Sequence, residues 1–184
     1  MKIGVCIKRV PGSDSRITFK DGAQGPDLSD VSWEVNPYDS FALEAALQLQ
    51  EAGTATDVVV FTVCGAEGDA KIRDALAVGK KGKSGASKAI RLDDPAFGGS
   101  DALGIARVLA TAMKKEGIEL VIAGKQSIDG DSAQVPVMMA EILGWPSVAE
   151  VTGLEIEGSS VKAWRSAGGG IREVVALSTP CVIT

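Results

Sequence analysis

The stretch "LVIAGKQSIDGDSAQVPVMMAEILG", residues 120–144, decides the fold class. It begins with a continuous apolar run, passes through an acidic and polar loop, and continues into an amphipathic segment. A short apolar run of this kind indicates a strand buried on both faces of a parallel sheet. The stretch therefore predicts a strand, a loop, and a helix with Pro136 in its first turn, beginning close to Asp131 or Ser132.

The same alternation of apolar strands and amphipathic helices occurs in the rest of residues 1–145. Further strands are expected at residues 3–7, 57–63 and 88–92, and a helix is expected to follow "VNPYD". Asn36 can cap that helix, Pro37 suits its first turn, and Gly53 can end it. Its expected apolar face comprises Phe41, Leu43, Ala46, Leu47 and Leu49. Ser100 is expected to cap a later helix over residues 101–117.

This repetition predicts an α/β fold, a Rossmann-like and mostly parallel sheet with helices on both faces. From residue 148 short alternating segments with Gly turns predict an antiparallel meander along one edge of that sheet. Residues 11–33 are polar and predict a long excursion or a small hairpin. We expect residues 1–184 to form one nucleotide-binding domain. Because "TPCVIT" resembles a strand at the chain end, we expect the natural protein to continue beyond it.

Composition excludes several classes of function. The net charge is −5 and the only basic cluster is the short "GKKGKSGASK", so nucleic-acid binding is not expected. The absence of histidine removes His-dependent triads and most zinc sites. Cys6, Cys64 and Cys181 are far apart beside apolar sequence, which favours buried free thiols in a reducing compartment. No apolar run approaches the roughly 20 residues that span a bilayer, so we expect a soluble, cytoplasmic protein without membrane insertion.

Ligands of open parallel sheets bind beyond the carboxyl ends of the strands, and the loop over residues 124–135 leaves such an end. Phosphate could be held by backbone N–H groups near Ser132, Ala133 and Gln134, with Gly130 allowing close approach. Asp129 and Asp131 would repel phosphate, so they are better suited to ribose hydroxyls or an adenine amino group. The alternative from the residues alone is that Asp131 or Ser132 simply caps a surface helix.

Three other loop chemistries do not fit this stretch. A calcium loop beginning at Asp129 would require Gly and Glu where Gln134 and Ala140 stand. The Walker loop and the G-x-G-x-x-G dinucleotide motif are both absent. "PGSDS" after the first strand is only faintly similar to the phosphate loop of ATP pyrophosphatases.

Several segments together resemble the β subunit of electron transfer flavoprotein. They cover almost the whole chain in order: "CIKRVP", "VNPYDSFALEAALQLQE", "VCG", "IRDALAVG", "LVIAGKQSIDGDSAQV" and "AEILGWP". The most specific are "NPYD-x-x-A-L-E-A-A" and "GKQSIDGDSAQV". The resemblance implies a non-enzymatic subunit that binds AMP and supports the FAD of an α subunit. The resulting heterodimer would carry electrons from acyl-CoA or similar dehydrogenases to a quinone reductase.

The resemblance also implies which residues bind the cofactor. By matching position they are Cys6, Asn36, Pro37, Tyr38, Asp39, Cys64, Gly124, Lys125, Gln126, Ser127, Ile128, Asp129, Gly130, Asp131, Ser132, Ala133, Gln134 and Val135. Tyr38 matches a position beside the flavin ring, and the alternative is that it packs on its own helix. Asn36 and Asp39 could instead be helix caps, and the two cysteines could be packing residues.

The chain departs from the family pattern in three places. The docking loop and C-terminal arm that embrace the α subunit are not in this sequence. The segment "AVGKKGKSGASKAIRL" is longer and more basic than the usual turn, which predicts an exposed, mobile loop. Pro136 stands where relatives often carry Gly and could alter how the helix start meets a phosphate.

Two alternatives remain. "DGDSAQV" leans toward relatives in which FAD replaces AMP and the complex bifurcates electrons from NADH, so AMP and FAD both stay open. The second alternative is a stand-alone, homodimeric nucleotide-binding regulator of the stress-protein type, which needs a Gly-rich phosphate loop. "SAGGGIREVV" is a poor version of that loop.

Overall fold

A parallel sheet forms the centre of the structure, a computed structural model that describes residues 1–20, 22, 25–79 and 85–184. Its strands in spatial order are β5 (Lys88–Leu92), β4 (Asp57–Val63), β1 (Lys2–Cys6), β6 (Leu120–Ala123), β11 (Cys181–Ile183) and β7 (Ser147–Val148). Each strand pairs in parallel with its neighbours. The predicted α/β class is confirmed.

The order of the strands creates a switch point beside β1. The chain moves outward from β1 to β4 and β5, then returns to the other side of β1 as β6. Connections on the two sides of such a point diverge, which leaves a crevice beyond the carboxyl ends of the strands. The ends of β1 and β6 are therefore the place where this fold offers a ligand site.

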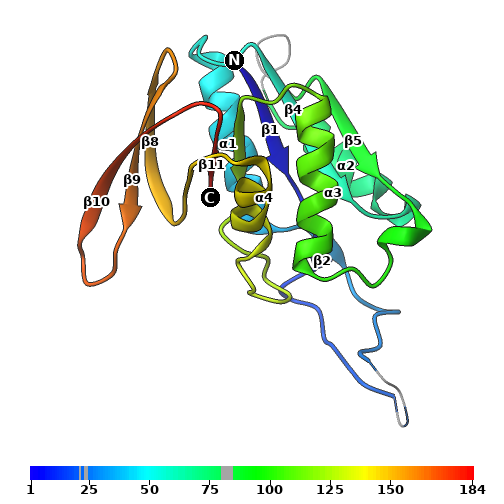
Figure 1. Cartoon of the computed structure of the whole chain (residues 1–184). Coiled ribbons are helices and arrows are strands. Elements are labelled where there is room, and N and C mark those ends of the chain that lie inside the picture. Colours follow the sequence, from blue (N-terminus) through cyan, green and yellow to red (C-terminus); the bar gives the residue numbers. More distant parts are fainter. Residues whose placement is uncertain (21, 23–24, 80–84) are drawn as a thin grey trace.

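Helices cover both faces of the sheet, as predicted (Figure 1). They are α1 (Pro37–Glu51), α2 (Asp69–Leu76), α3 (Ala102–Lys115) and α4 (Val135–Leu143), with short 3-10 turns η1 (Ala66–Gly68) and η2 (Pro95–Phe97). Alternate residues of β4 face opposite ways. Val58 and Val60 belong to the core under α1, whereas Val59 and Phe61 belong to the core under α3 and α4. Two apolar layers thus hold the sheet between the helices.

The first helix begins and ends where the sequence predicts, but its first contacts differ. Pro37 is its first residue, and Gly53 follows its end with φ +79°, a left-handed conformation that suits glycine. The prediction that the Asn36 side chain caps the helix is wrong, because that side chain makes no cap hydrogen bond. Asn36 instead contacts the loop after β6, a non-local partner that no local pattern reveals.

The predicted apolar face of α1 is correct in its centre and wrong at Phe41. Leu43, Ala46 and Leu47 are buried, but Phe41 is 72% exposed. Phe41 lies two residues before Leu43, about 200° around the helix axis. It therefore projects away from the stripe that the sheet buries.

Two other helix starts shift by one to four residues. The α3 cap is Asp101 rather than Ser100, since the Asp101 carboxylate accepts from the Gly104 N–H at 2.8 Å. Pro136 lies in the first turn of α4, as predicted, but that helix begins at Val135. Asp131 and Ala133 have φ of +49° and +51°, which a right-handed helix cannot include. Neither Asp131 nor Ser132 caps it.

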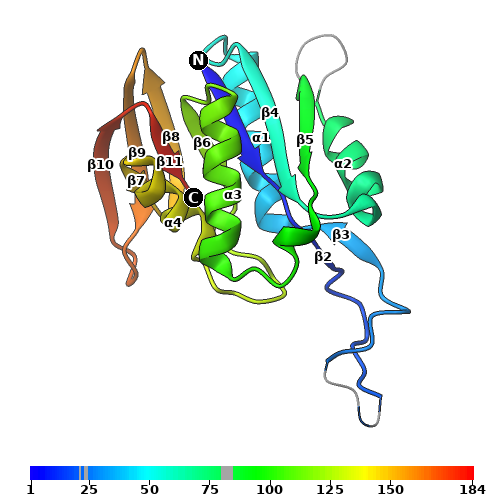
Figure 2. The same cartoon turned by 45° about the vertical axis from the view of Figure 1, so that its right-hand side comes forward.

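The described residues between 11 and 33 form an arm that projects from the body (Figure 2), in agreement with the small hairpin that was one of the two expectations for this segment. Its base is the antiparallel pair β2 (Arg9–Pro11) and β3 (Trp33–Val35), and Thr18 bridges Asp27 farther out. The Arg9 guanidinium lies 3.5 Å from the centre of the Trp33 ring, a cation–π contact that fixes the base.

The predicted meander is present but forms a sheet of its own beside the body (Figure 1). Its strands are β8 (Val151–Glu157), β9 (Ser160–Ser166) and β10 (Arg172–Ser178), with β9 in the middle. Val161 and Ala163 of β9 are fully buried in the core that contains α1. The chain then re-enters the parallel sheet as β11, between β6 and β7.

Two further predictions concern the basic loop and membrane insertion. Residues 80–84, in the middle of the predicted basic loop, lie outside the described residues. Among the helices of the described ranges, none has the length and apolarity needed to cross a membrane.

Candidate functional site

A cavity of about 320 Å³ opens at the switch point. It lies beyond the carboxyl ends of β1, β4 and β6, and the first residues of α3 and α4 also line it. Helix N-termini carry unpaired N–H groups and the positive end of the helix dipole. The cavity, called the strand-end cavity below, is therefore a place where an anionic group is favoured.

The structure gathers most of the predicted cofactor residues around this cavity. Those that line it are Cys6, Asn36, Asp39, Gly124, Lys125, Gln126, Ser127, Ser132, Ala133, Gln134 and Val135. The predicted residues outside its lining are Pro37, Tyr38, Cys64, Ile128, Asp129, Gly130 and Asp131. Three of the four segments named from the sequence thus meet at one rim. The fourth, Cys64, is not in the lining, although Thr62 and Val63 just before it are.

Other lining residues were not predicted. They are Ile7, Lys8, Thr62, Val63, Ser100, Asp101, Ala102, Ile105, Leu109, Ala123 and Pro136. Lys8 could have been predicted as a lining residue, because it directly follows the apolar run that ends at Ile7. The α3 residues could have been found by applying the strand-end rule to the helix that precedes β6. Val63, Ile105 and Leu109 give the cavity an apolar wall that suits a base.

Asn36 ties the start of α1 to the loop after β6. Its side chain is almost fully buried, its Nδ2 donates to the Gln126 carbonyl at 2.9 Å, and its Oδ1 accepts from the Ile128 N–H at 3.2 Å. A buried amide with both ends satisfied by backbone fixes the position of that backbone. Asn36 is therefore a positioning residue for the loop.

Asp39 joins the ends of the two strands at the switch point. Its Oδ2 accepts from the Lys8 N–H at 2.7 Å, and the Gly124 N–H also donates to its carboxylate. Burial raises the pKa of Asp39 to about 7, against hydrogen bonds from Asn36, Lys8 and Gly124 that lower it. The β1 and β6 ends are thus held together by one buried carboxyl.

Gly124 lets α1 approach this junction closely. A Cβ at Gly124 would lie 2.3 Å from Asp39 Oδ1 and 2.8 Å from the Tyr38 carbonyl carbon. These separations leave no room for a side chain. The glycine in "IAGKQ" is required by the close contact between α1 and β6.

The loop over residues 124–135 presents backbone donors to the cavity. Asp131 N–H donates to the Ser127 carbonyl at 2.9 Å, and Gln126 Nε2 donates to Asp131 Oδ1 at 2.6 Å. Within the described residues, the N–H groups of Ser132, Ala133 and Gln134 have no protein acceptor. Three successive free amides that line one cavity can hold an anion.

The backbone conformation of this segment is that of an anion-binding nest. Ala133 has φ +51°, and Gln134 follows in the right-handed helical region at φ −102° and ψ −42°. Alternation between left- and right-handed residues turns successive N–H groups toward a common concavity. Non-glycine residues at positive φ are strained, and such strain concentrates at functional sites.

The charged residues that line the cavity are few and balanced, two lysines against two aspartates. Lys8 Nζ lies 2.7 Å from Asp129 Oδ2, and Lys125 Nζ lies 3.6 Å from Glu150 Oε1. Asp101 caps α3. This balance suits a single phosphate better than a triphosphate, which would need several unopposed cations or a metal.

The cysteines give no sign of thiol chemistry. All three are free. Burial raises the pKa of Cys181 to about 11, and burial, aided by the Asp39 carboxylate, raises that of the Cys6 thiol. Raised pKa values keep the sulfurs protonated and poorly nucleophilic. Over the described part of the chain, no group of three His, Cys, Asp or Glu side chains is placed to hold a metal.

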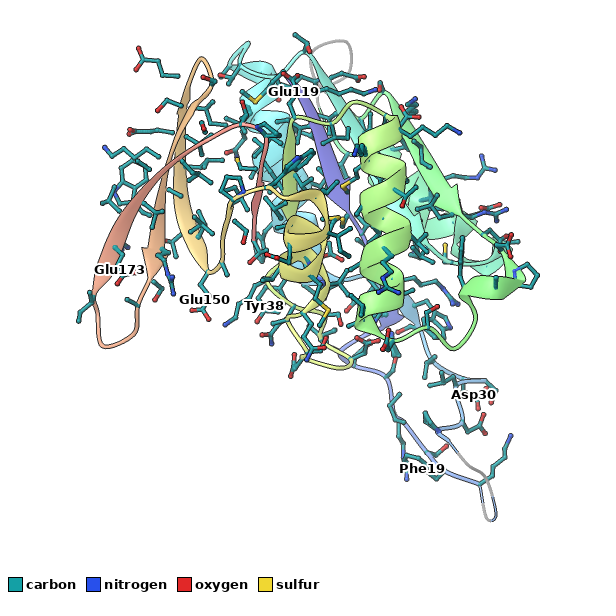
Figure 3. All side chains as sticks on the ribbon, in the orientation of Figure 1. Phe19, Asp30, Tyr38, Glu119, Glu150 and Glu173 are labelled. Carbon is teal, nitrogen blue, oxygen red and sulfur yellow. The ribbon has the colours of Figure 1, made fainter. Side chains whose placement is uncertain are left out.

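A second hollow lies on the other side of the β6 end, between α1 and β8. This α1–β8 groove of about 710 Å³ is lined by Tyr38, Phe41, Ala42, Ala45, Gln48, Leu49, Ile122, Ala123, Gly124, Lys125, Glu150, Val151, Thr152, Gly153, Leu154, Ser166, Ile183 and Thr184. Tyr38 therefore faces this groove and not the strand-end cavity. Figure 3 labels Tyr38 and Glu150 on the body and Phe19 on the projecting arm.

Comparison with known proteins gives consistent matches. The family model described as electron transfer flavoprotein domain matches residues 28–184. Electron transfer flavoprotein subunit beta of Bradyrhizobium diazoefficiens is 36% identical over 184 residues, covering all of this chain and 70% of the relative. The caffeyl-CoA reductase–Etf complex subunit CarD of Acetobacterium woodii is also 36% identical, over 186 residues and 68% of its length. Protein FixA of Azorhizobium caulinodans is 37% identical over 192 residues, 65% of its length.

Proposed function

Because the chain belongs to the electron transfer flavoprotein β-subunit family, we propose that it is an electron-carrier subunit that binds AMP in the strand-end cavity. In this role residues 1–184 act as one nucleotide-binding domain. The nucleotide is structural: it fills the crevice between the β1 and β6 ends and fixes the loop over residues 124–135. The chain itself supplies no acid, base or nucleophile, and its contribution is to position a cofactor.

One observation carries the nucleotide assignment. The Ser132, Ala133 and Gln134 amides have no acceptor among the described residues, and they line the cavity at the start of α4. A phosphate would accept these three hydrogen bonds and meet the positive end of the helix dipole. Val63, Ile105 and Leu109 would cover a face of the base. Asn36 and Asp39 hold the surrounding backbone in place.

Size and charge favour a mononucleotide. A cavity of about 320 Å³ is at the small end of the range for ligand pockets, roughly 300–1,000 Å³. It suits one nucleoside with one phosphate better than a flavin dinucleotide. The two lysines in its lining are each paired with a carboxylate, which also disfavours a triphosphate. AMP is the ligand that meets both limits.

The electron-transfer role requires partners. We propose an α subunit that holds most of an FAD, and this flavin supplies the one- and two-electron chemistry when bound. Acyl-CoA or similar dehydrogenases would donate the electrons, and a quinone reductase would accept them. The relatives from Bradyrhizobium and Acetobacterium are both named as subunits, which supports a multi-chain assembly. Free, protonated thiols fit a reducing cytoplasm.

A second candidate is an FAD-binding β subunit of an NADH-linked, electron-bifurcating flavoprotein. The Acetobacterium relative is a subunit of a caffeyl-CoA reductase–Etf complex, and its sequence identity to this chain equals that of the Bradyrhizobium relative. This equal identity supports the second candidate. It requires the larger cofactor to occupy the strand-end cavity. Family membership removes the reason to consider a stand-alone stress-type regulator.

The test is to identify what the protein carries. The purified chain is denatured, and released small molecules are separated by chromatography and identified by absorbance. Apo protein is then titrated with AMP, adenosine and FAD by calorimetry. Release of AMP, or AMP binding with adenosine weaker, supports the proposal. Release or tighter binding of FAD supports the second candidate, and failure to bind any of the three contradicts both.

A further inference from the structure

We propose that Lys8 is a phosphate-binding residue of the strand-end cavity and that Asp129 competes with the phosphate for it. The inference rests on the proposed function, because it assigns a side chain to the phosphate of the nucleotide proposed above. It goes beyond the predicted cofactor residues, among which Lys8 does not appear.

The position of Lys8 brings its ammonium to the phosphate end of the cavity. Lys8 lines the cavity, and its Nζ lies 3.3 Å from the hydroxyl of Ser127, another lining residue. Ser127 begins the segment that leads to the three free amides. The Lys8 ammonium lies beyond the end of β1, and the nest of N–H groups at the start of α4 lies beyond the end of β6. Both groups would contact the same anion.

The donors of Lys8 are held mainly by Asp129. A lysine ammonium has three N–H donors. In the described ranges Lys8 Nζ lies 2.8 Å from Asp129 Oδ1, 2.7 Å from Asp129 Oδ2 and 3.3 Å from the Ser127 hydroxyl. A phosphate must therefore displace the Asp129 carboxylate to bind this ammonium. The side chain is 53% exposed, so it can turn toward the cavity without loss of core packing.

The Lys8–Asp129 pair is not needed to shape the loop. Asn36 already holds it through two hydrogen bonds, and the Asp131–Ser127 and Gln126–Asp131 hydrogen bonds close its turn. Exposed ion pairs add little to stability. Partial burial raises the pKa of Asp129, but hydrogen bonds from Lys8 and Ser127 hold that pKa below its usual range. Asp129 is therefore ionised when it contacts Lys8.

The other lysine in the lining is directed elsewhere. Lys125 Nζ lies 3.6 Å from Glu150 Oε1, and Glu150 lines the α1–β8 groove, not the cavity. Lys125 is thus drawn to the opposite side of β6. Lys8, by contrast, contacts Ser127, which lines the cavity, as well as Asp129 of the same loop.

The test measures how strongly each variant prefers AMP to adenosine, by calorimetry on the apo chain. Lys8→Met should lower AMP affinity by about ten- to a hundredfold, the loss expected for one hydrogen bond to a charged group. Adenosine affinity should change by less than about twofold, since adenosine lacks the phosphate. Lys20→Met, which removes the exposed Lys20–Asp27 pair of the arm, is the matched control and should change neither.

Asp129→Asn separates a phosphate ligand from a structural ion pair. If Lys8 binds phosphate, this variant frees its ammonium and AMP affinity rises, opposite in sign to Lys8→Met. If the pair only orders the loop, both variants break it, and both weaken AMP and adenosine alike; that result overturns the inference. Wild-type protein that binds AMP no better than adenosine contradicts the proposed function instead, so the two failures are distinguishable.

Discussion

The two hollows beside the β6 end differ in how they are made. The strand-end cavity is built from segments that follow strands, and its distinctive groups are free amides and balanced charges. The α1–β8 groove is built from a helix face and the meander, and it exposes the Tyr38 and Phe41 rings. Both share Gly124 as a wall.

Because of this difference the two hollows favour different kinds of ligand, although both lie at the end of β6. Free N–H groups and a buried carboxyl have strong directional requirements and therefore favour a small, charged ligand of defined shape. The groove offers mainly apolar surface with one exposed ion pair, Lys125–Glu150, which imposes little direction. Only the strand-end cavity has the features of a nucleotide site.

The largest effect is expected where the two hollows meet. Gly124→Ala would place Cβ within 3 Å of three atoms of Tyr38 and Asp39. Overpacking of this kind costs about 3 kcal/mol of unfolding free energy or more, because the contacts are partly with backbone. AMP binding should weaken at the same time. Urea unfolding and calorimetry measure both.

Gly130→Ala is the matched control, since no heavy atom lies within 4 Å of a Cβ at that position. It should leave the unfolding free energy within about 0.5 kcal/mol of wild type. Equal stability of the Gly124 and Gly130 variants would show that the shared wall is not closely packed.

The second effect concerns the buried carboxyl on the cavity side. The pKa of Asp39 is about 7, against 3.8 for the free group, so between these values the native state holds a proton that the unfolded state releases. The contribution of Asp39 to stability should therefore fall as pH rises from about 4 to 7, by on the order of a few kcal/mol, and then level off.

Asp39→Asn removes this titration. The difference in unfolding free energy between wild type and Asp39→Asn should shrink or reverse in favour of the variant from pH 4 to 7. A wild-type advantage that grows with pH would contradict the raised pKa.

A smaller effect is expected from the strained loop. Ala133 has φ +51°, where glycine avoids the penalty of a Cβ. Ala133→Gly should raise the unfolding free energy by up to about 1 kcal/mol. Ala149→Gly, at a residue without positive φ, should lower it by a similar amount. Thermal unfolding measures the stability of both variants. A change in stability of the same sign in both would argue against strain at Ala133.

The smallest effect is expected on the groove side. Phe41 is 72% exposed, so Phe41→Ala should change stability by less than about 0.5 kcal/mol and AMP affinity by less than about twofold. Leu47→Ala, on the buried face of the same helix, should cost about 2–5 kcal/mol. Weaker AMP binding by the Phe41 variant would show that the groove and the cavity are coupled.

The sequence predicts most of the fold because its signals are local. Apolar runs, Gly53 and Pro136 mark strands and helix ends without reference to distant residues. The errors arise where distant contacts decide. Asn36 bonds to the loop ninety residues away instead of capping its helix, and Phe41 is exposed because the sheet covers a different stripe of α1.

The same distinction holds for the candidate site. The cavity could be foreseen in outline, since strand ends and helix starts line it. Lys8 and Asp101 were missed although each lies where the strand-end rule applies; that both line one cavity depends on how α3 and the loop pack around β1. The resemblance placed Tyr38 in the "NPYD" cofactor segment and beside the flavin ring; because alternate positions of a helix start face different ways, Tyr38 lines the groove and not the strand-end cavity. The groove itself depends on the meander packing beside α1, which no short motif encodes.

The most direct test of the central claim follows backbone amides during titration with AMP and with adenosine, by nitrogen–proton correlation spectra of the labelled apo chain. We predict that AMP shifts the Ser132, Ala133 and Gln134 amides more than any others and that adenosine leaves them nearly unmoved. AMP binding that leaves these three amides in place, with the largest shifts around the α1–β8 groove, would contradict the account.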